Sequence, residues 1–210
     1  MRSSSIISLL ASGLSLVSAL PSDFRITHAT RSAPPPRGAV RIRSITYGGN
    51  GCPQGSLDWQ LSDDQGIIPL IFDDFVAYTG GDAPTTERRK FCQLNIALDI
   101  PAGYSFSIWQ TGYLGYVALD PGTTGTLSTL YYFSGEQNQN EHKTVFRGPL
   151  NKDYTAFNTE PMGIYSPCGG EVLLNVRSSV AVSGSGNALM TNDKQSNNFR
   201  QFLYLDWRNC

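Results

Sequence analysis

Apolar and polar residues alternate along most of the chain after Arg43, with a period of two residues. In QLNIALDI (residues 93–100) every second position is apolar, and YSFSI (residues 104–108) repeats the pattern. Such alternation is typical of strands that bury one face and expose the other. Further short runs of this kind follow at YLGYVAL, TLSTLYYF, HKTVF, EVLLNV, SSVAV and QFLYLDW.

Turn-forming residues separate these runs, as in DPGTTG, SGEQNQNE and SGSGN, and no segment keeps a helical stripe for three turns. The pattern therefore predicts an all-β fold of roughly eight to ten short strands. Strands of this length with regular turn signals favour an antiparallel β-sandwich, and a β-barrel is the alternative.

The N-terminal stretch MRSSSIISLLASGLSLVSALPSDF carries one basic residue, an apolar run from Ile6 to Val17 and a small-x-small site that ends at Ala19. We expect residues 1–19 to be a secretory signal peptide. The apolar run is shorter than the roughly 20 residues that cross a bilayer, and no later segment is apolar for long enough to span one. The protein is therefore expected to be secreted and extracellular, without a membrane span.

Residues 20–39 end in RSAPPPRGA and lack apolar periodicity, so we expect a flexible or polyproline-like lead segment, either a propeptide or a spacer. Residues 40–210 are long enough to form one domain with its own core. The chain has 16 Lys and Arg against 17 Asp and Glu. Because so balanced a chain offers no excess of basic residues for phosphates, we expect no nucleic-acid partner.

Four cysteines stand at Cys52, Cys92, Cys168 and Cys210. An even number in a secreted chain indicates disulfides, and none of the spacings is short enough to suggest a metal site. Of the three possible pairings we expect Cys52 with Cys92 and Cys168 with Cys210, since each closes a loop of about 40 residues, which is worth about 4 kcal/mol. We expect neither a bound metal nor a cofactor.

Several segments, among them ITYGGNGCPQGS, RRKFCQLNIALDIPAGYSFSI, GYLGYVALDPG, SPCGG and LDWRNC, are similar to a family of fungal secreted proteins known as domain of unknown function 4360. The resemblance extends from Val40 to Cys210 and includes the order of all four cysteine contexts. It implies a secreted, disulfide-bonded domain. It brings no activity, cofactor or catalytic residue with it.

Candidate catalytic residues are few. The adjacent acids Asp63-Asp64 and Asp73-Asp74 could bind calcium or act on a glycosidic bond, but neighbours on a strand point to opposite faces, and turn carboxylates explain them more simply. His142 is the only imidazole of the domain and has no nucleophile motif beside it. We therefore assign no catalytic residue.

Aromatic residues offer the other candidate site, because rings on a sheet can stack against sugars or can simply fill the core. If this segment is one unbroken strand with Phe106 and Ile108 facing the protein core, the odd-numbered Trp109 and Tyr113 share the exposed face. We therefore predict this pair as ligand-binding residues. A bulge at a glycine of GYLGY would reverse that phase. The remaining candidates for a platform or for core packing are Trp59, Trp207, Tyr116, Tyr131 and Tyr132.

Secretion, disulfides and the lack of catalytic motifs together favour a non-enzymatic extracellular protein that binds a cell-wall or host-surface polysaccharide. The alternative is a carbohydrate-active hydrolase or lyase whose carboxylates come together from separate strands.

Overall fold

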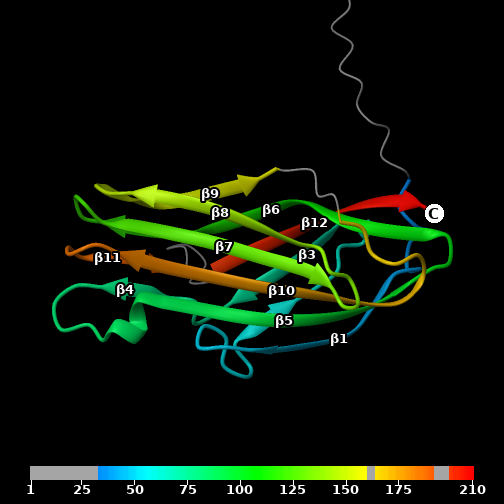
Figure 1. The fold of residues 1–210 in the computed structure, drawn as a ribbon, viewed down its shortest axis with the longest axis horizontal. Coiled ribbons are helices and arrows are strands. Elements are labelled where there is room, and N and C mark those ends of the chain that lie inside the picture. Colours follow the sequence, from blue (N-terminus) through cyan, green and yellow to red (C-terminus); the bar gives the residue numbers. More distant parts are fainter. Residues whose placement is uncertain (1–32, 160–163, 192–198) are drawn as a thin grey trace, which may run out of the picture. The chain divides into compact units, whose positions relative to one another are not determined.

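The computed structural model describes residues 33–159, 164–191 and 199–210, which form two antiparallel β-sheets (Figure 1). Sheet A has the strand order β1-β5-β10-β7-β8. Sheet B has the order β2-β3-β12-β6-β11-β4, and β9 also pairs with β6. The strands of sheet A are β1 (Arg41–Gly48), β5 (Arg89–Ile100), β7 (Thr124–Phe133), β8 (Gln139–Arg147) and β10 (Gly170–Ser183). Those of sheet B are β2 (Leu57–Trp59), β3 (Ile67–Phe72), β4 (Ala77–Thr79), β6 (Tyr104–Leu119), β9 (Leu150–Asn158), β11 (Ala188–Thr191) and β12 (Phe199–Asn209).

The fold is a sandwich, as the alternating pattern predicted. Within the described ranges no ladder joins sheet A to sheet B, so the sheets do not close into a barrel. The helical content of these ranges is one short 3₁₀ turn, η1 (Thr85–Arg88), and none of their helices is long and apolar enough to cross a membrane. Pairing is antiparallel throughout, which is the arrangement that short turns can connect.

Along one edge of β6, two shorter strands pair one after the other. β12 pairs with β6 from Tyr104 to Leu114, and β11 continues along the same edge from Tyr116 to Leu119. β3 and β4 form the next row in the same way, since β3 pairs with β12 and β4 pairs with β11. The sixteen-residue β6 is therefore the strand to which the rest of sheet B is registered.

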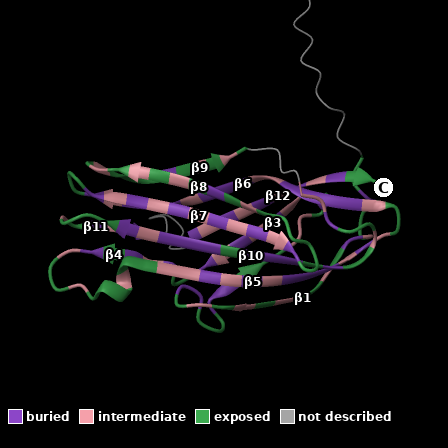
Figure 2. Cartoon of the chain, viewed as in Figure 1, coloured by how far each residue is buried: buried purple, intermediate pink, exposed green. Residues whose placement is uncertain are grey.

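The core lies between the two sheets and follows from the period-two pattern. Along β7 every second residue is buried, and β5 shows a similar alternation (Figure 2). Phe106 from sheet B meets Phe133 from sheet A edge to face, with ring centroids 5.2 Å apart, and Trp207 packs against Phe106 at the same distance. Edge-to-face contacts of this kind are favourable because the ring edge is positive and the ring face negative.

Both expected disulfides are confirmed. Cys52 pairs with Cys92, and Cys168 pairs with Cys210. Gly49 explains the glycine-rich turn before Cys52, because its φ of +153° is unusual for other residues and a Cβ atom would lie 2.1 Å from the carbonyl oxygen of Phe91. The turn therefore lies close against β5, where the partner cysteine is located.

The last part of the lead segment is packed against the domain. Pro35 is buried, and the Gln65 side chain donates hydrogen bonds to the carbonyl oxygens of Pro35 and Pro36, both at 2.9 Å. Gln65 Oε1 accepts from the Val40 backbone at 2.7 Å, and the Gln65 carbonyl accepts from Trp207 Nε1 at 2.9 Å. Residues 33–39, the last part of the expected lead segment, are thus held in place. Residues 1–32, with the expected signal peptide, lie outside the described ranges.

We expect each disulfide to contribute separately to stability. Replacing Cys52 and Cys92 together with serine should lower the free energy of unfolding by about 4 kcal/mol, because the unfolded chain regains the entropy of a loop of about 40 residues. The double replacement of Cys168 and Cys210 should have an effect of similar size. Denaturant unfolding of the two double variants measures both values, and losses below about 1 kcal/mol in both would contradict the expectation.

Candidate functional site

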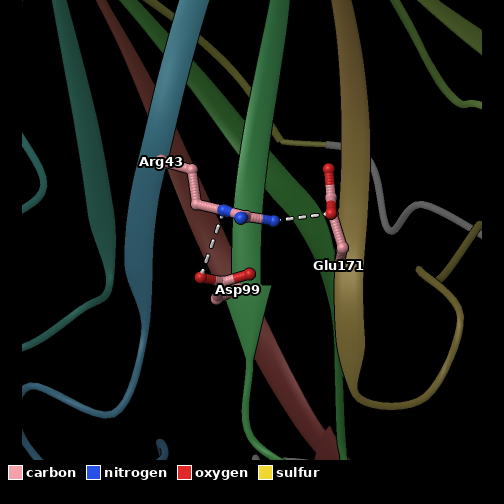
Figure 3. A network of polar contacts seen from close by, with 3 residues as sticks. All are labelled: Arg43, Asp99 and Glu171. Carbon is pink, nitrogen blue, oxygen red and sulfur yellow. Dashed lines mark hydrogen bonds and ion pairs between the residues drawn. The ribbon is translucent and has the colours of Figure 1, made fainter.

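The outer face of sheet A carries a cluster of charged residues. Arg43 on β1, Asp99 on β5 and Glu171 on β10 form a charged cluster across three strands (Figure 3). Arg43 Nη1 lies 2.6 Å from Glu171 Oε2, and Arg43 Nε lies 3.6 Å from Asp99 Oδ2. All three side chains are about half exposed, so the cluster is a hydrated surface feature that contributes less than about 1 kcal/mol per pair.

Further polar contacts lie elsewhere on that face. Ser128 donates a hydrogen bond to Glu141 between β7 and β8, and the Arg177 guanidinium lies 5.1 Å from the Phe91 ring centroid. Apolar side chains stand among these polar ones, since Val145 on β8 is 48 % exposed and Leu173 on β10 is 38 % exposed. The outer face of sheet A is therefore mixed in character.

Sheet B presents aromatic rings on its outer face. Trp109 on β6, Phe157 on β9, and Phe202 and Tyr204 on β12 form a group that we call the aromatic face. Tyr204 is at its centre, with ring centroids 5.9 Å from Trp109, 6.4 Å from Phe157 and 6.4 Å from Phe202. Phe157 is 52 % exposed and the other three rings are partly exposed. Apolar residues of β3 continue the face beyond β12, at Ile67, Pro69 and Ile71.

Gly112 makes room for these rings. It pairs with Phe202 on one side and with Phe157 on the other, so it lies between two aromatic side chains. A Cβ atom at Gly112 would lie 2.8 Å from the Phe157 ring and 3.3 Å from the Tyr204 ring. The first glycine of GYLGY therefore lets rings from three strands approach one another across β6.

A β-bulge at Trp109 decides which residues of β6 face outward. Leu205 pairs with Ile108 and Tyr204 pairs with Gln110, so Trp109 is the extra residue of its strand. Beyond the bulge the odd-numbered positions turn toward the core. Tyr113 is consequently only 1 % exposed, and the expectation that it lies on the exposed face with Trp109 is wrong. Trp109 itself stays on the outer face.

The other aromatic candidates are distributed over the molecule. Trp207 and Tyr131 are core residues, and Tyr116 is nearly buried, with its hydroxyl donating to Asn151 at 2.6 Å. Trp59 is 40 % exposed but lies on the edge strand β2. Sequence reasoning missed Phe157, Phe202 and Tyr204. Period-two alternation in QFLYLDW could have indicated the last two, because Leu203, Leu205 and Trp207 occupy the core positions between and beyond them.

The acidic pairs occupy turns. Asp64 accepts hydrogen bonds from the Ser62 hydroxyl and the Gly66 backbone, and these bonds hold the pKa of Asp64 below its ordinary value. Its carboxylate is thus kept ionised, which suits a turn and not a general acid. Asp73 and Asp74 are exposed directly after β3. Among the described residues, no three His, Cys, Asp or Glu side chains come together as a metal site.

A chain of buried polar side chains crosses the core between the sheets. Tyr113 OH donates to Thr129 Oγ1 at 2.6 Å, and Gln201 Nε2 donates to the same oxygen at 3.0 Å. Ser178 Oγ donates to Gln201 Oε1 at 2.5 Å. These residues come from four strands, two in each sheet, so the chain links the two sheets by directional bonds.

His142 belongs to the same interior. It is 3 % exposed, its Nδ1 lies 3.2 Å from Thr111 Oγ1, and its Nε2 lies 3.1 Å from Tyr131 OH. Because each ring nitrogen forms a hydrogen bond with a hydroxyl group, one from Thr111 and one from Tyr131, His142 has a structural role here. It also lines a polar recess of about 280 Å³ beside Phe157, together with Glu141, Lys143, Asn158 and Thr159.

The fold and this surface together define a class: a disulfide-bonded β-sandwich with a cluster of aromatic rings on the outer face of one sheet. Comparison with known proteins gives the family, since residues 38–210 match the domain described as "Domain of unknown function (DUF4360)". The chain is also 40 % identical, over 176 residues, to an "Uncharacterized secreted protein" of Arthroderma benhamiae, an alignment that covers 81 % of this chain and 72 % of that protein. This chain belongs to the DUF4360 family, and the expectation of a secreted protein is confirmed.

Two buried tyrosines provide a test of the interior. Burial raises the pKa of Tyr113 although hydroxyl contacts, such as that with Thr129, oppose the shift, and burial likewise raises the pKa of Tyr154. Above about pH 10 the unfolded chain loses these phenolic protons and the folded chain keeps them, so stability should fall as pH rises. Tyr113→Phe and Tyr154→Phe should each reduce that slope by about 1.4 kcal/mol per pH unit.

At neutral pH the same two variants should differ. Y113F removes a hydrogen bond to Thr129 and should cost about 1 kcal/mol. Tyr154 OH has no partner among the described residues, so Y154F should leave stability unchanged or raise it. Denaturant unfolding at pH 7 and between pH 9 and 11 measures both effects. If Y113F and Y154F lose the same free energy of unfolding at pH 7, the hydrogen bond from Tyr113 to Thr129 contributes nothing to stability.

Proposed function

We propose that this secreted protein binds an extracellular polysaccharide through the aromatic face of sheet B and does not cleave it. The supporting observation is the clustering of four rings on the outer face of sheet B, where Tyr204 lies beside the other three. An exposed group of rings costs solubility and is a common mark of a binding site.

Sugars fit this surface chemically. The C–H faces of a pyranose ring stack on aromatic rings, while its hydroxyl groups need polar partners at the edge. Trp109, Tyr204 and Phe157 offer the rings. The recess beside Phe157 adds Glu141, Lys143 and Asn158 as donors and acceptors. A purely apolar ligand would leave these polar groups unused.

The arrangement of carboxylates favours binding over hydrolysis. β6 carries no acidic residue, and the strands that flank it in sheet B carry Asp206 on β12 and Asp153 on β9. Asp206 pairs with Ser107 and Asp153 with Tyr116, nine positions apart along β6, which is about 30 Å. Glycosidases need two carboxyl groups within about 5–10 Å of each other. These two acids are too far apart to act on one glycosidic bond.

Replacing Trp109 and Tyr204 with alanine should abolish retention on the polysaccharide. Each lost ring should weaken binding by about 2 kcal/mol, because aromatic anchors carry most of the energy of such contacts. Retention on insoluble chitin, β-glucan, mannan and plant-wall polymers measures this, with thermal unfolding as a check of folding. Soluble sugar products are measured in the same incubations.

Trp59→Ala is the matched control, because Trp59 is exposed but lies on the edge strand β2 outside the aromatic face. Its retention should equal that of the unmodified protein. Equal retention of the Trp109/Tyr204 variant, or release of soluble sugars by the unmodified protein, would refute the proposal.

A further inference from the structure

We infer that the ligand is a long, linear, uncharged polysaccharide that lies along β6 and occupies a second subsite at the far end of sheet B. This inference rests on the proposed function and adds the class of polymer and its direction. It starts from a pocket of about 590 Å³ that we call the end pocket. Its lining includes Tyr78, Ala118, Asp120, Asn151, Asn187 and Leu189.

The end pocket opens on the same side of sheet B as the aromatic face. Tyr78 pairs with Leu189, Leu189 with Ala118, and Ala118 with Asn151, so these residues form one row across β4, β11, β6 and β9. Ala118 has the same parity as Gly112, and no register shift separates them in the ladder with β9. Side chains at both positions therefore point to the outer face.

The lining suits a sugar unit better than a lipid chain. Ala118, Leu150 and Leu189 supply apolar area, and the Tyr78 ring is 38 % exposed beside them. At the rim, Asp120 Oδ2 accepts hydrogen bonds at 2.9 Å from both the backbone and the side-chain nitrogen of Asn187. A ring beside fixed carboxylate and amide groups can stack on a sugar, and those groups can hydrogen-bond its hydroxyl groups. An acyl chain would instead take the Asp120 carboxylate out of water and offer it no hydrogen bond in return.

Charge narrows the ligand further. Among the described residues that line the end pocket, Asp120 is the only charged one. Its carboxylate would repel the carboxylate or sulfate of an acidic sugar at short range. An uncharged sugar meets no such penalty, and so the pocket favours neutral polymers.

Distance sets the length of the ligand. Gln110, next to Trp109, and Ala118 are eight positions apart along β6, which is about 26 Å. A short oligosaccharide can occupy one subsite only, whereas a chain that spans this distance occupies both. Because the second contact is then intramolecular, affinity should rise by about 10²-fold or more.

The test is a length series of neutral oligosaccharides prepared from the polymer that retains the protein, from disaccharide to decasaccharide, measured by titration calorimetry. We expect a step in affinity of at least tenfold once the chain spans the two subsites. Tyr78→Ala should remove the step, so that long chains bind no more tightly than short ones. Polygalacturonate, an acidic polymer, should not bind.

Separate outcomes identify separate failures. If Trp109→Ala abolishes binding but affinity shows no step with length, or Y78A keeps the step, the inference is overturned and the proposed function stands. If the Trp109 and Tyr204 variants still bind, the proposed function itself falls. Should Y78A fail to fold, Tyr78→Gln keeps a long side chain on β4 without a ring, and thermal unfolding identifies the variant to use.

Discussion

The structure depends on a single change of phase in β6, the strand to which the rest of sheet B is registered. Before Trp109 the even-numbered residues Phe106 and Ile108 are buried, and after it the odd-numbered Tyr113 and Val117 are. One extra residue therefore allows a sixteen-residue strand to bury apolar side chains along its whole length while it curves with the sandwich. The residue left over at that point is a tryptophan, and it lies on the outer face.

The core that this phase creates is partly polar. Tyr113 enters it with a hydroxyl group, which is accommodated because it donates a hydrogen bond to Thr129 of the opposite sheet, and Gln201 donates to the same threonine oxygen. A buried hydroxyl without a partner costs about 1–3 kcal/mol, so such a network stabilises only when its members are together. The hydrogen bonds from Ser178 to Gln201 and from Gln201 to Thr129 also fix the position of sheet A on sheet B. Apolar contacts alone are not directional and would fix it less strictly.

Sequence patterns predicted the sandwich and both disulfides, because alternation and cysteine spacing are local signals that tertiary contacts rarely override. They failed at Tyr113, since nothing in SIWQTGYLGY distinguishes a bulge at Trp109 from an unbroken strand, and a shift of one residue exchanges the two faces. They also missed the packing of Pro35, which depends on Gln65, a residue 30 positions away. Both failures concern partners that lie far apart in sequence.

The group of rings on the outer face of sheet B has a cost of hydration, and this cost bears on how the protein works outside the cell. Charged residues such as Arg43 and Glu171 are hydrated on the outer face of sheet A, whereas the rings of Trp109, Phe157 and Tyr204 gather on that of sheet B. Gly112 is informative here, because an alanine in its place would push against the Phe157 ring. A surface that served solubility alone would gain from polar residues where Trp109, Phe157 and Tyr204 stand. The proposed function rests on their clustering over Gly112, because a bound ligand would cover these rings and remove their cost of hydration.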